Sequence, residues 1–500
     1  MITIYKILLN TIPLVQLFCC AGIAQKEVAE APIVTKIDQY ISRSVENGYA
    51  GSILVAKEGE ILLSKGYGWA NKEHNIPNQS QTLFNIGSVT KQFTAAAILK
   101  LMENGKLSVS NTLEDYFSMV PADKQQITIH QLLTHTSGIS PQTGGFRYDT
   151  ATKGQFVEEA FAAELLYPPG TRHTYANANY IFLAAIIEAV SQQEYESFLR
   201  EHFWKPLQMN DTGYKSNGAR DEQLAHGYYF NVVDGTWADW GTTQDHLPQE
   251  AHWYSIGKGD LYASVEDLYK WDVALREYKV LKKETIQLME MAYVPENDEK
   301  TSFYGYGWAI FNSAKGSKIV THNGSNGIYF ADVIRDMDND IVVIVLSNVI
   351  LNSQSETIGW ELLKMLYDEN YEPEIVPKNP YELVFDFMTS NTPEKVTALP
   401  TFLERNLGSS LTDKALLNRI GFKQISEHKD SNWGIALLQL NTQLFPNDGN
   451  LWDTLGEGYF ILQEHEKAIM CFQKAIALGQ HENCYWCENS AKRLKELLEE

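Results

Sequence analysis

The chain has 500 residues, of which 44% are hydrophobic and 21% are charged, a balance typical of soluble globular proteins with two or three domains. The same composition argues against disorder on a large scale. Its 41 basic and 63 acidic residues give a formal charge of −22, which disfavours nucleic acid and anionic lipid as partners.

The N-terminus predicts an exported protein. Lys6 precedes an apolar run over residues 7–18, which small residues follow, so we expect a signal peptide over residues 1–24 and a periplasmic or secreted location. A first helix of the folded domain is the alternative. Cys19 and Cys20 leave open a lipid anchor. The run is too short to cross a bilayer and no later run is long enough, so the mature chain is expected to have no transmembrane span.

The region before residue 370 predicts an α+β domain in which one antiparallel sheet is built from both ends of the chain and flanked by helices. Apolar residues at helical or strand spacing mark the elements. Helices are expected at 34–46 and 355–366, and strand pairs at 52–56 with 61–67 and at 328–334 with 341–346.

The C-terminal part differs in character. Three prolines and several acidic residues mark a linker, which we place at 369–390, and a small all-α region is expected over 391–500. Within this region, six residues match the tetratricopeptide pattern, and a plain helical hairpin is the alternative. Such repeats could bind a protein partner. The matching residues are Trp452, Leu455, Gly456, Tyr459, Ala468 and Phe472.

Cysteines are scarce beyond the N-terminal segment. Cys471, Cys484 and Cys487 all lie near the C-terminus, which excludes a disulfide framework for the main domain. Cys484 and Cys487 form a single C-x-x-C pair, for which a disulfide or two free thiols is favoured over zinc.

Ser88 and Lys91 are the first candidate catalytic pair. They open an apolar helix, and residues three apart lie on the same face of a helix, so the lysine amine is expected beside the serine hydroxyl. A serine becomes a useful nucleophile when a neighbouring base takes its proton. Taken alone the pattern is weak, because serine is also a common helix N-cap.

Two further patterns carry polar groups suited to catalysis. Tyr175 could act as an acid or base, and the amide of Asn177 could hold a substrate carbonyl or orient the lysine. Later, His322, Gly324 and Ser325 lead into the strand expected at 328–334, where an edge strand could pair with an extended substrate and stabilise an oxyanion. A surface turn is the alternative for the segment that carries His322, Gly324 and Ser325.

Together these patterns resemble the penicillin-recognising serine hydrolases, which carry S-x-x-K, Y-x-N and K-T-G or H-x-G in this order. The resemblance spans residues 37–366 and includes stretches similar to class C β-lactamases and D-alanyl-D-alanine carboxypeptidases. It implies a β-lactamase-like domain over residues 30–368 that uses no cofactor and no metal. His130 and His135 are therefore not expected to bind a metal, since no carboxylate lies at ligand spacing from them.

The resemblance also implies a role for each site residue. Ser88 is the nucleophile, Lys91 its activating partner and Tyr175 the general acid and base. Asn177, His322, Gly324 and Ser325 bind substrate, and the backbone N–H groups of Ser88 and Ser325 form the oxyanion hole. No deacylating glutamate of the class A type is evident, so Tyr175 and Lys91 are expected to serve deacylation too.

We therefore predict a hydrolase that forms an acyl-enzyme on Ser88 and acts on D-amino-acid peptides, β-lactams or esters. His322 stands where lactamases have a lysine, which favours carboxypeptidases and esterases over efficient lactamases. A protonated imidazole there could bind a substrate carboxylate, or His322 could make a hydrogen bond within the site. A non-catalytic scaffold that recruits a partner through its repeats is the alternative function.

Overall fold

The computed structural model describes residues 32–145, 148–214, 223–248, 252–349, 352–479 and 484–499. The expected signal peptide over residues 1–24, with Cys19 and Cys20, lies outside the described residues. Among the helices of the described ranges, none has both the length and the apolar character needed to cross a membrane.

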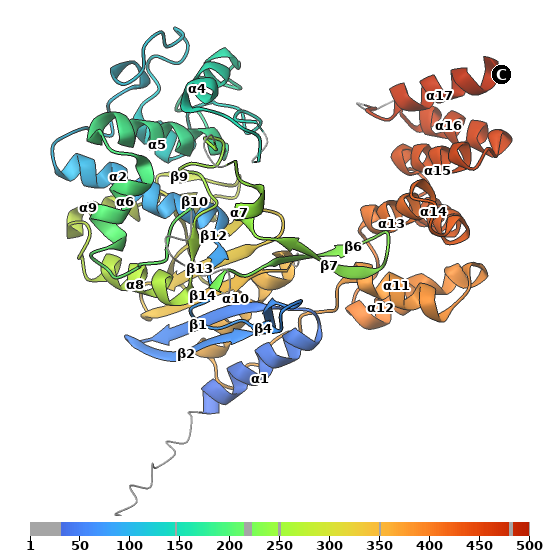
Figure 1. The fold of residues 1–500 in the computed structure, drawn as a ribbon, viewed down its shortest axis with the longest axis horizontal. Coiled ribbons are helices and arrows are strands. Elements are labelled where there is room, and N and C mark those ends of the chain that lie inside the picture. The colour runs from blue at the N-terminus through green and yellow to red at the C-terminus, as the bar shows by residue number, and fades with distance from the viewer. Residues whose placement is uncertain are drawn as a thin grey trace, which may run out of the picture.

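The N-terminal part of the described chain, over residues 32–367, is organised around one eight-stranded sheet (Figure 1). All neighbouring strands in it are antiparallel, as predicted. Its order is β2-β1-β14-β13-β12-β11-β10-β9, so the first and last strands of the domain lie side by side. The strands are β1 (Gly51–Lys57), β2 (Glu60–Tyr67), β9 (Val294–Pro295), β10 (Ser302–Tyr304), β11 (Ala309–Asn312), β12 (Lys318–Ser325), β13 (Phe330–Asp336) and β14 (Ile341–Ser347).

Helices cover both faces of the sheet. On one face, α1 (Pro32–Glu46) and α10 (Asn352–Tyr367) pack their apolar residues against alternate residues of β1 and β14. The opposite face packs against α8 (Val265–Arg276) and the larger helical part of the domain, which contains α2 (Thr90–Glu103) and α5 (Asn177–Ser191). Because strand side chains alternate between faces, β1 and β14 are buried on both sides and consist mostly of apolar residues.

The remaining elements of this domain are short, and most of them lie on the face of the sheet that packs against α2, α5 and α8. They are β3 (Trp69–Asn71), β4 (Ile76–Pro77), β5 (Phe84–Asn85), the 3₁₀ turn η1 (Gly87–Val89), η2 (Leu113–Asp115), α3 (Ile129–Leu133), α4 (Lys153–Ala162), α6 (Tyr195–Leu199), η3 (Arg200–Trp204), β6 (Gly227–Asn231), β7 (Thr236–Gly241), α7 (Thr243–His246), β8 (Tyr262–Ala263) and α9 (Lys283–Met289).

Four strands of the sheet, β9 to β12, were missed from the sequence, and β12 matters most for the site. His322, Gly324 and Ser325 do not lead into the strand expected at 328–334 but end a separate strand, β12, which pairs with β13 from Ile319 to Ser325. The Asn-Gly pair and the following Ser325–Gly327 stretch resemble a turn in sequence, which concealed the strand. β12 is also not an edge strand, but β11 pairs with it only as far as Thr321, so its last four residues have no strand on that side.

The C-terminal region is all helical, and it begins earlier than expected. Helix α11 (Pro380–Ser390) lies within the stretch predicted as a linker, and its apolar face packs against later helices. Residues 369–379 also pack on the first domain, where Val376 is fully buried beside α1 and Lys36 donates a hydrogen bond to the carbonyl of Tyr371. The linker prediction failed because proline and acidic residues are equally compatible with a packed extended segment and with a helix start.

Helices α13 to α17 follow as successive antiparallel hairpins (Figure 1). Leu455, Tyr459, Ala468 and Phe472, which suggested a tetratricopeptide, lie together in one apolar cluster. The repeat assignment itself stays a prediction.

Cys484 and Cys487 form a disulfide, and Cys471 is buried and unbonded. The helices are η5 (Pro393–Ala398), α12 (Leu399–Leu407), α13 (Lys414–Ser426), α14 (Ser431–Leu444), α15 (Gly449–Ile461), α16 (His465–Gly479) and α17 (Cys487–Glu499).

The hairpin β6–β7 projects from the first domain and reaches the C-terminal helices (Figure 1). The ring of Phe230 packs on that of Phe385 in α11, with ring centroids 5.6 Å apart. Gln424 in α13 donates hydrogen bonds to the carbonyls of Val232 and Val233 at the tip of the hairpin. The hairpin β6–β7 and the C-terminal helices therefore contact each other directly, in addition to being joined through the chain at residues 369–379.

Candidate active site

Ser88 and Lys91 lie side by side at the start of α2. Ser88 occupies the turn η1 and Lys91 the first turn of the helix, and Lys91 Nζ lies 3.0 Å from Ser88 Oγ. The fully buried amine also lies 2.9 Å from Oδ1 of Asn177 and 2.6 Å from the carbonyl of Lys258. These three oxygens are all uncharged, and they fix the amine against the serine hydroxyl.

Two glycines let the strand β12 approach this turn closely. Gly87 has a φ of +48°, and a Cβ there would lie 2.6 Å from the backbone nitrogen of Ser325. A Cβ at Gly324 would lie 2.2 Å from the carbonyl oxygen of Ile86 and 2.5 Å from the nitrogen of Ser88. Any larger residue at either position would push the strand away from the nucleophile.

Tyr175 lies on the other side of Ser88. A hydrogen bond joins the two side chains, and Lys91 Nζ lies 4.9 Å from the centroid of the tyrosine ring. Burial raises the pKa of Tyr175 above the ordinary value of a phenol, and the hydrogen bond with Ser88 acts in the opposite direction. At neutral pH the residue is therefore a protonated phenol that can donate a proton.

His135 positions this tyrosine. Its ring stacks on that of Tyr175 with centroids 4.3 Å apart, and its Nδ1 accepts a hydrogen bond from the backbone N–H of Ala176. Burial lowers the pKa of His135 well below its ordinary value, and the charge of Lys91 adds to this effect. A neutral His135 thus holds the segment that carries the candidate acid. His130 lies elsewhere and hydrogen-bonds the hydroxyl of Tyr306.

His322 is buried and its ring nitrogens both have partners. Nδ1 lies 2.6 Å from the carbonyl of Asn323, to which it can only donate, and Nε2 lies 2.9 Å from the hydroxyl of Tyr304, from which it accepts. Burial lowers the pKa of His322 to about 3, and the charge of Lys91 adds to this. These two contacts and the lowered pKa favour the alternative of a neutral imidazole that makes a hydrogen bond within the site over a protonated imidazole that binds a carboxylate.

A cavity of about 510 Å³ opens over Ser88 and runs along the end of β12 that β11 does not cover. Five of the predicted site residues line it, and Lys91 and Asn177 lie behind the serine. Tyr304, which was not singled out from the sequence, lies beside them, and a lone tyrosine in a short strand offers no signal that could have found it. The lining residues are Ser88, Tyr175, Glu296, Tyr304, Ala309, Phe311, Thr321, His322, Asn323, Gly324, Ser325, Asp332, Glu356 and Trp360.

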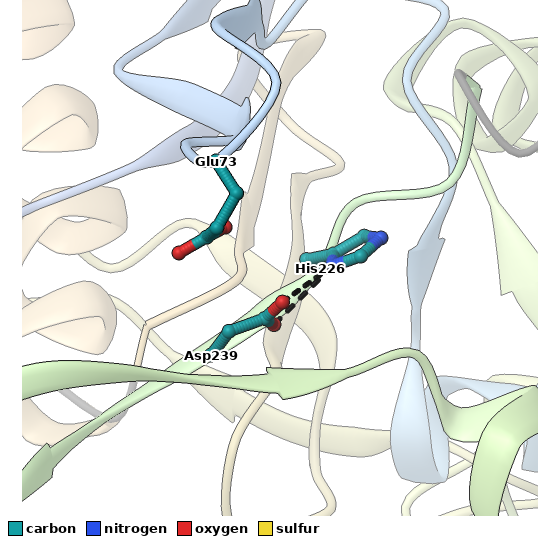
Figure 2. Close-up of side chains that lie close together, drawn as sticks. All are labelled: Glu73, His226 and Asp239. Carbon is teal, nitrogen blue, oxygen red and sulfur yellow. Dashed lines mark hydrogen bonds and ion pairs between the residues drawn. The ribbon is translucent and has the colours of Figure 1, made fainter.

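A separate group of metal-ligand side chains lies near the base of the hairpin β6–β7. Glu73, His226 and Asp239 place one potential ligand atom each within 4.8 Å of one another (Figure 2). Asn71 Nδ2 lies 3.0 Å from Nε2 of His226 and donates a hydrogen bond to it. The orientation of the Asn71 amide is fixed because its Oδ1 accepts a hydrogen bond from the backbone N–H of His74. Nδ1 of His226 therefore carries the proton and donates it to Asp239, so this nitrogen is not available as a metal ligand.

Comparison with known proteins agrees with this fold. The Beta-lactamase family model matches residues 37–363, and the chain belongs to this family. A putative penicillin-binding protein, PbpX, of Bacillus subtilis is 30% identical over 334 residues, which cover 67% of this chain and 78% of the relative. Penicillin-binding protein 4* of the same organism is 28% identical over 316 residues, covering 60% of this chain and 68% of the relative.

Solved structures show the same likeness. The octameric penicillin-binding protein homologue from Pyrococcus abyssi is 29% identical with a TM-score of 0.60, covering 70% of this chain and 81% of the homologue. The D-amino acid amidase from Ochrobactrum anthropi SV3, at 20% identity and a TM-score of 0.58, covers 68% of this chain and all of that one, and it shares the fold.

Proposed function

We propose that the protein is a serine acyl hydrolase that forms an acyl-enzyme on Ser88. The observation that carries this proposal is the position of Lys91 Nζ, 3.0 Å from Ser88 Oγ and surrounded by uncharged oxygens. When the amine is neutral, two of its N–H bonds point to the oxygens of Asn177 and Lys258, and its lone pair faces the serine hydroxyl. Lys91 is then the base for the nucleophile.

In the acylation step, Ser88 Oγ bonds to the substrate carbonyl carbon as its proton passes to Lys91. The backbone N–H groups of Ser88 and Ser325 stabilise the resulting oxyanion, and the close approach of Gly324 to Ser88 brings them together. Collapse of the intermediate breaks the bond to the leaving group.

Tyr175 donates the proton that the leaving group needs, which its raised pKa and its hydrogen bond to Ser88 support. Lys91 then returns the serine proton to the tyrosine. Deacylation reverses the sequence with water as the nucleophile, so the same two groups serve both half-reactions. His322 and Tyr304 form a neutral hydrogen-bonded pair that shapes the wall of the site.

We propose D-amino-acid peptides, β-lactams and simple esters as the substrate classes, and a location outside the cytoplasm on account of the N-terminal pattern. Turnover of D-alanyl-D-alanine peptides, a chromogenic cephalosporin and p-nitrophenyl esters tests this, with Ser88→Ala as the control. Turnover by the wild type alone supports the proposal. If the wild type neither hydrolyses any of these compounds nor is acylated by them, the alternative of a non-catalytic scaffold is favoured. Such a scaffold would have no need of Ser88, Lys91 and Tyr175 together.

A further inference from the structure

Three carboxyl groups line the cavity beside Ser88. Glu296 lies near enough to raise the pKa of both Tyr175 and Tyr304 through its charge. Asp332 pairs with Asn323 across β13 and β12, one residue from the glycine that touches Ser88. Glu356 in α10 lies half-buried beside Asp332 and acts on it electrostatically. The cavity is thus acidic along its length, starting at the nucleophile.

These carboxyl groups lack compensating positive charge. None of the three forms an ion pair with another residue that the structure describes, and no lysine or arginine is among the described lining residues. Glu296 accepts a hydrogen bond from the hydroxyl of Ser302, and Asp332 accepts hydrogen bonds from the hydroxyl of Thr321 and the backbone N–H of Val333. Burial raises the pKa of Asp332 to about 7, and the neighbouring charge of Glu356 adds to the effect. Buried carboxylates are normally paired with a cation, so the cavity is suited to receive one.

The geometry favours an organic cation over a metal ion. Among the described residues, the ligand atoms of Glu73, His226 and Asp239 all lie within 4.8 Å of one another, as a metal site requires, whereas the oxygens of these three carboxyl groups do not. Aromatic rings line the same cavity, and those of Phe311 and Trp360 lie 5.7 Å apart. Carboxylates together with aromatic faces are the groups that bind alkylammonium ions.

We propose that Glu296, Asp332 and Glu356 form an acidic subsite that selects acyl substrates carrying an ammonium group. The proposal rests on the proposed function of Ser88 and names its substrate class. It also gives a physical reason for His322, because a neutral residue at the position of the lactamase lysine adds no positive charge to the cavity lining that would repel such a substrate.

Paired phosphorylating probes test the subsite. Alkyl fluorophosphonates with arms of two, four and six carbons would end either in trimethylammonium or in the isosteric, neutral tert-butyl group. In each, Ser88 Oγ displaces fluoride from phosphorus, and the serine proton leaves with it. The quantity measured is the ratio of the two second-order labelling rate constants, which cancels any change in the reactivity of the serine itself.

We expect a ratio of about ten or more for at least one arm length in the wild type, which is the size of one desolvated contact between a quaternary ammonium and an aromatic face. Glu296→Gln and Glu356→Gln should each lower the ratio several-fold. Glu299→Gln is the matched control, because it removes an exposed carboxyl from the same loop as Glu296 and should leave the ratio unchanged. A wild-type ratio near one at every arm length, or the same fall in all three variants, overturns the proposal.

A binding measurement keeps the subsite separate from catalysis. Ser88→Ala cannot be labelled, but its affinity for choline can be compared with that for 3,3-dimethylbutanol by calorimetry. Tighter binding of choline supports the subsite even if neither probe labels the wild type, a result that would contradict the proposed function alone. Equal affinity for the two alcohols overturns the subsite whatever the labelling shows.

Discussion

A Cβ at Gly324 would lie 2.5 Å from the backbone nitrogen of Ser88, so the strand β12 and the nucleophile turn touch through a glycine. The same contact sets the spacing between the N–H groups of Ser88 and Ser325. Because backbone atoms surround the glycine, no side-chain rotation can make room for a methyl group.

Gly324→Ala should lower kcat/KM on the order of a hundredfold, the effect of losing one oxyanion-hole donor. Steady-state ester hydrolysis measures it. Gly154→Ala is the control, because its Cβ would meet nothing closer than 4.0 Å in α4 and alanine favours a helix. Full activity of Gly324→Ala would show that the approach of the strand to Ser88 has no role in catalysis.

Tyr175→Phe should slow hydrolysis in a way that depends on the leaving group. The phenol supplies a proton that an alkoxide or amine needs to depart, whereas p-nitrophenolate leaves without one. Because kcat/KM reports acylation, we expect a loss of about a hundredfold in kcat/KM for alkyl esters and amides and a much smaller loss in kcat/KM for p-nitrophenyl esters. Equal losses for both kinds of substrate would assign Tyr175 a role in activating the nucleophile instead.

His322 should not titrate in the working range of the enzyme. Its pKa is lowered to about 3, so the imidazole is neutral from pH 5.5 to 8. The test uses Asp332→Asn, because the carboxyl of Asp332 lines the same cavity and burial raises its pKa to about 7. In this variant the ratio of kcat/KM for a carboxylate-bearing ester to that for its neutral methyl ester should therefore stay constant over this range. A protonated imidazole that bound the carboxylate would instead make the ratio fall as the pH rises through its pKa.

Removal of the C-terminal helices should leave an active enzyme with a loosened hairpin. A chain ending at residue 379 keeps Val376 on α1 and every candidate catalytic residue, but it exposes Phe230 at the hairpin β6–β7. Loss of this contact should cost about 1.5–3 kcal/mol at the hairpin. We expect faster proteolytic cleavage at 231–235 with ester hydrolysis largely retained. A truncated protein that folds but is inactive would place the helices within the catalytic unit.

The sequence predicted the framework of the fold well. Alternating apolar runs gave β1, β2, β13 and β14 to within a few residues, because buried strands leave a strong periodic signal. β12 escaped because its end carries the small and polar residues that substrate and nucleophile require. Helix α11 escaped because prolines stand before and at its start, where they are compatible with both a linker and a helix.

The candidate site was predictable where residues lie close together in sequence. Ser88 and Lys91 share one helical turn, and the Y-x-N pattern supplied their partners. The contributions of His135, Tyr304 and Glu296 depend on contacts between distant segments, and a single residue of each kind carries no local pattern. The protonation state of His322 was likewise hidden, because it follows from burial and from a partner on another strand.

The most direct test of the account is the site of covalent modification. After reaction with a neutral fluorophosphonate, intact-mass measurement and peptide mapping should show one adduct per chain, on Ser88. Ser88→Ala should show none while keeping its circular dichroism spectrum, and Lys91→Met should label far more slowly. An adduct on another residue, or undiminished labelling of Ser88→Ala, would contradict the assignment of Ser88 as the nucleophile.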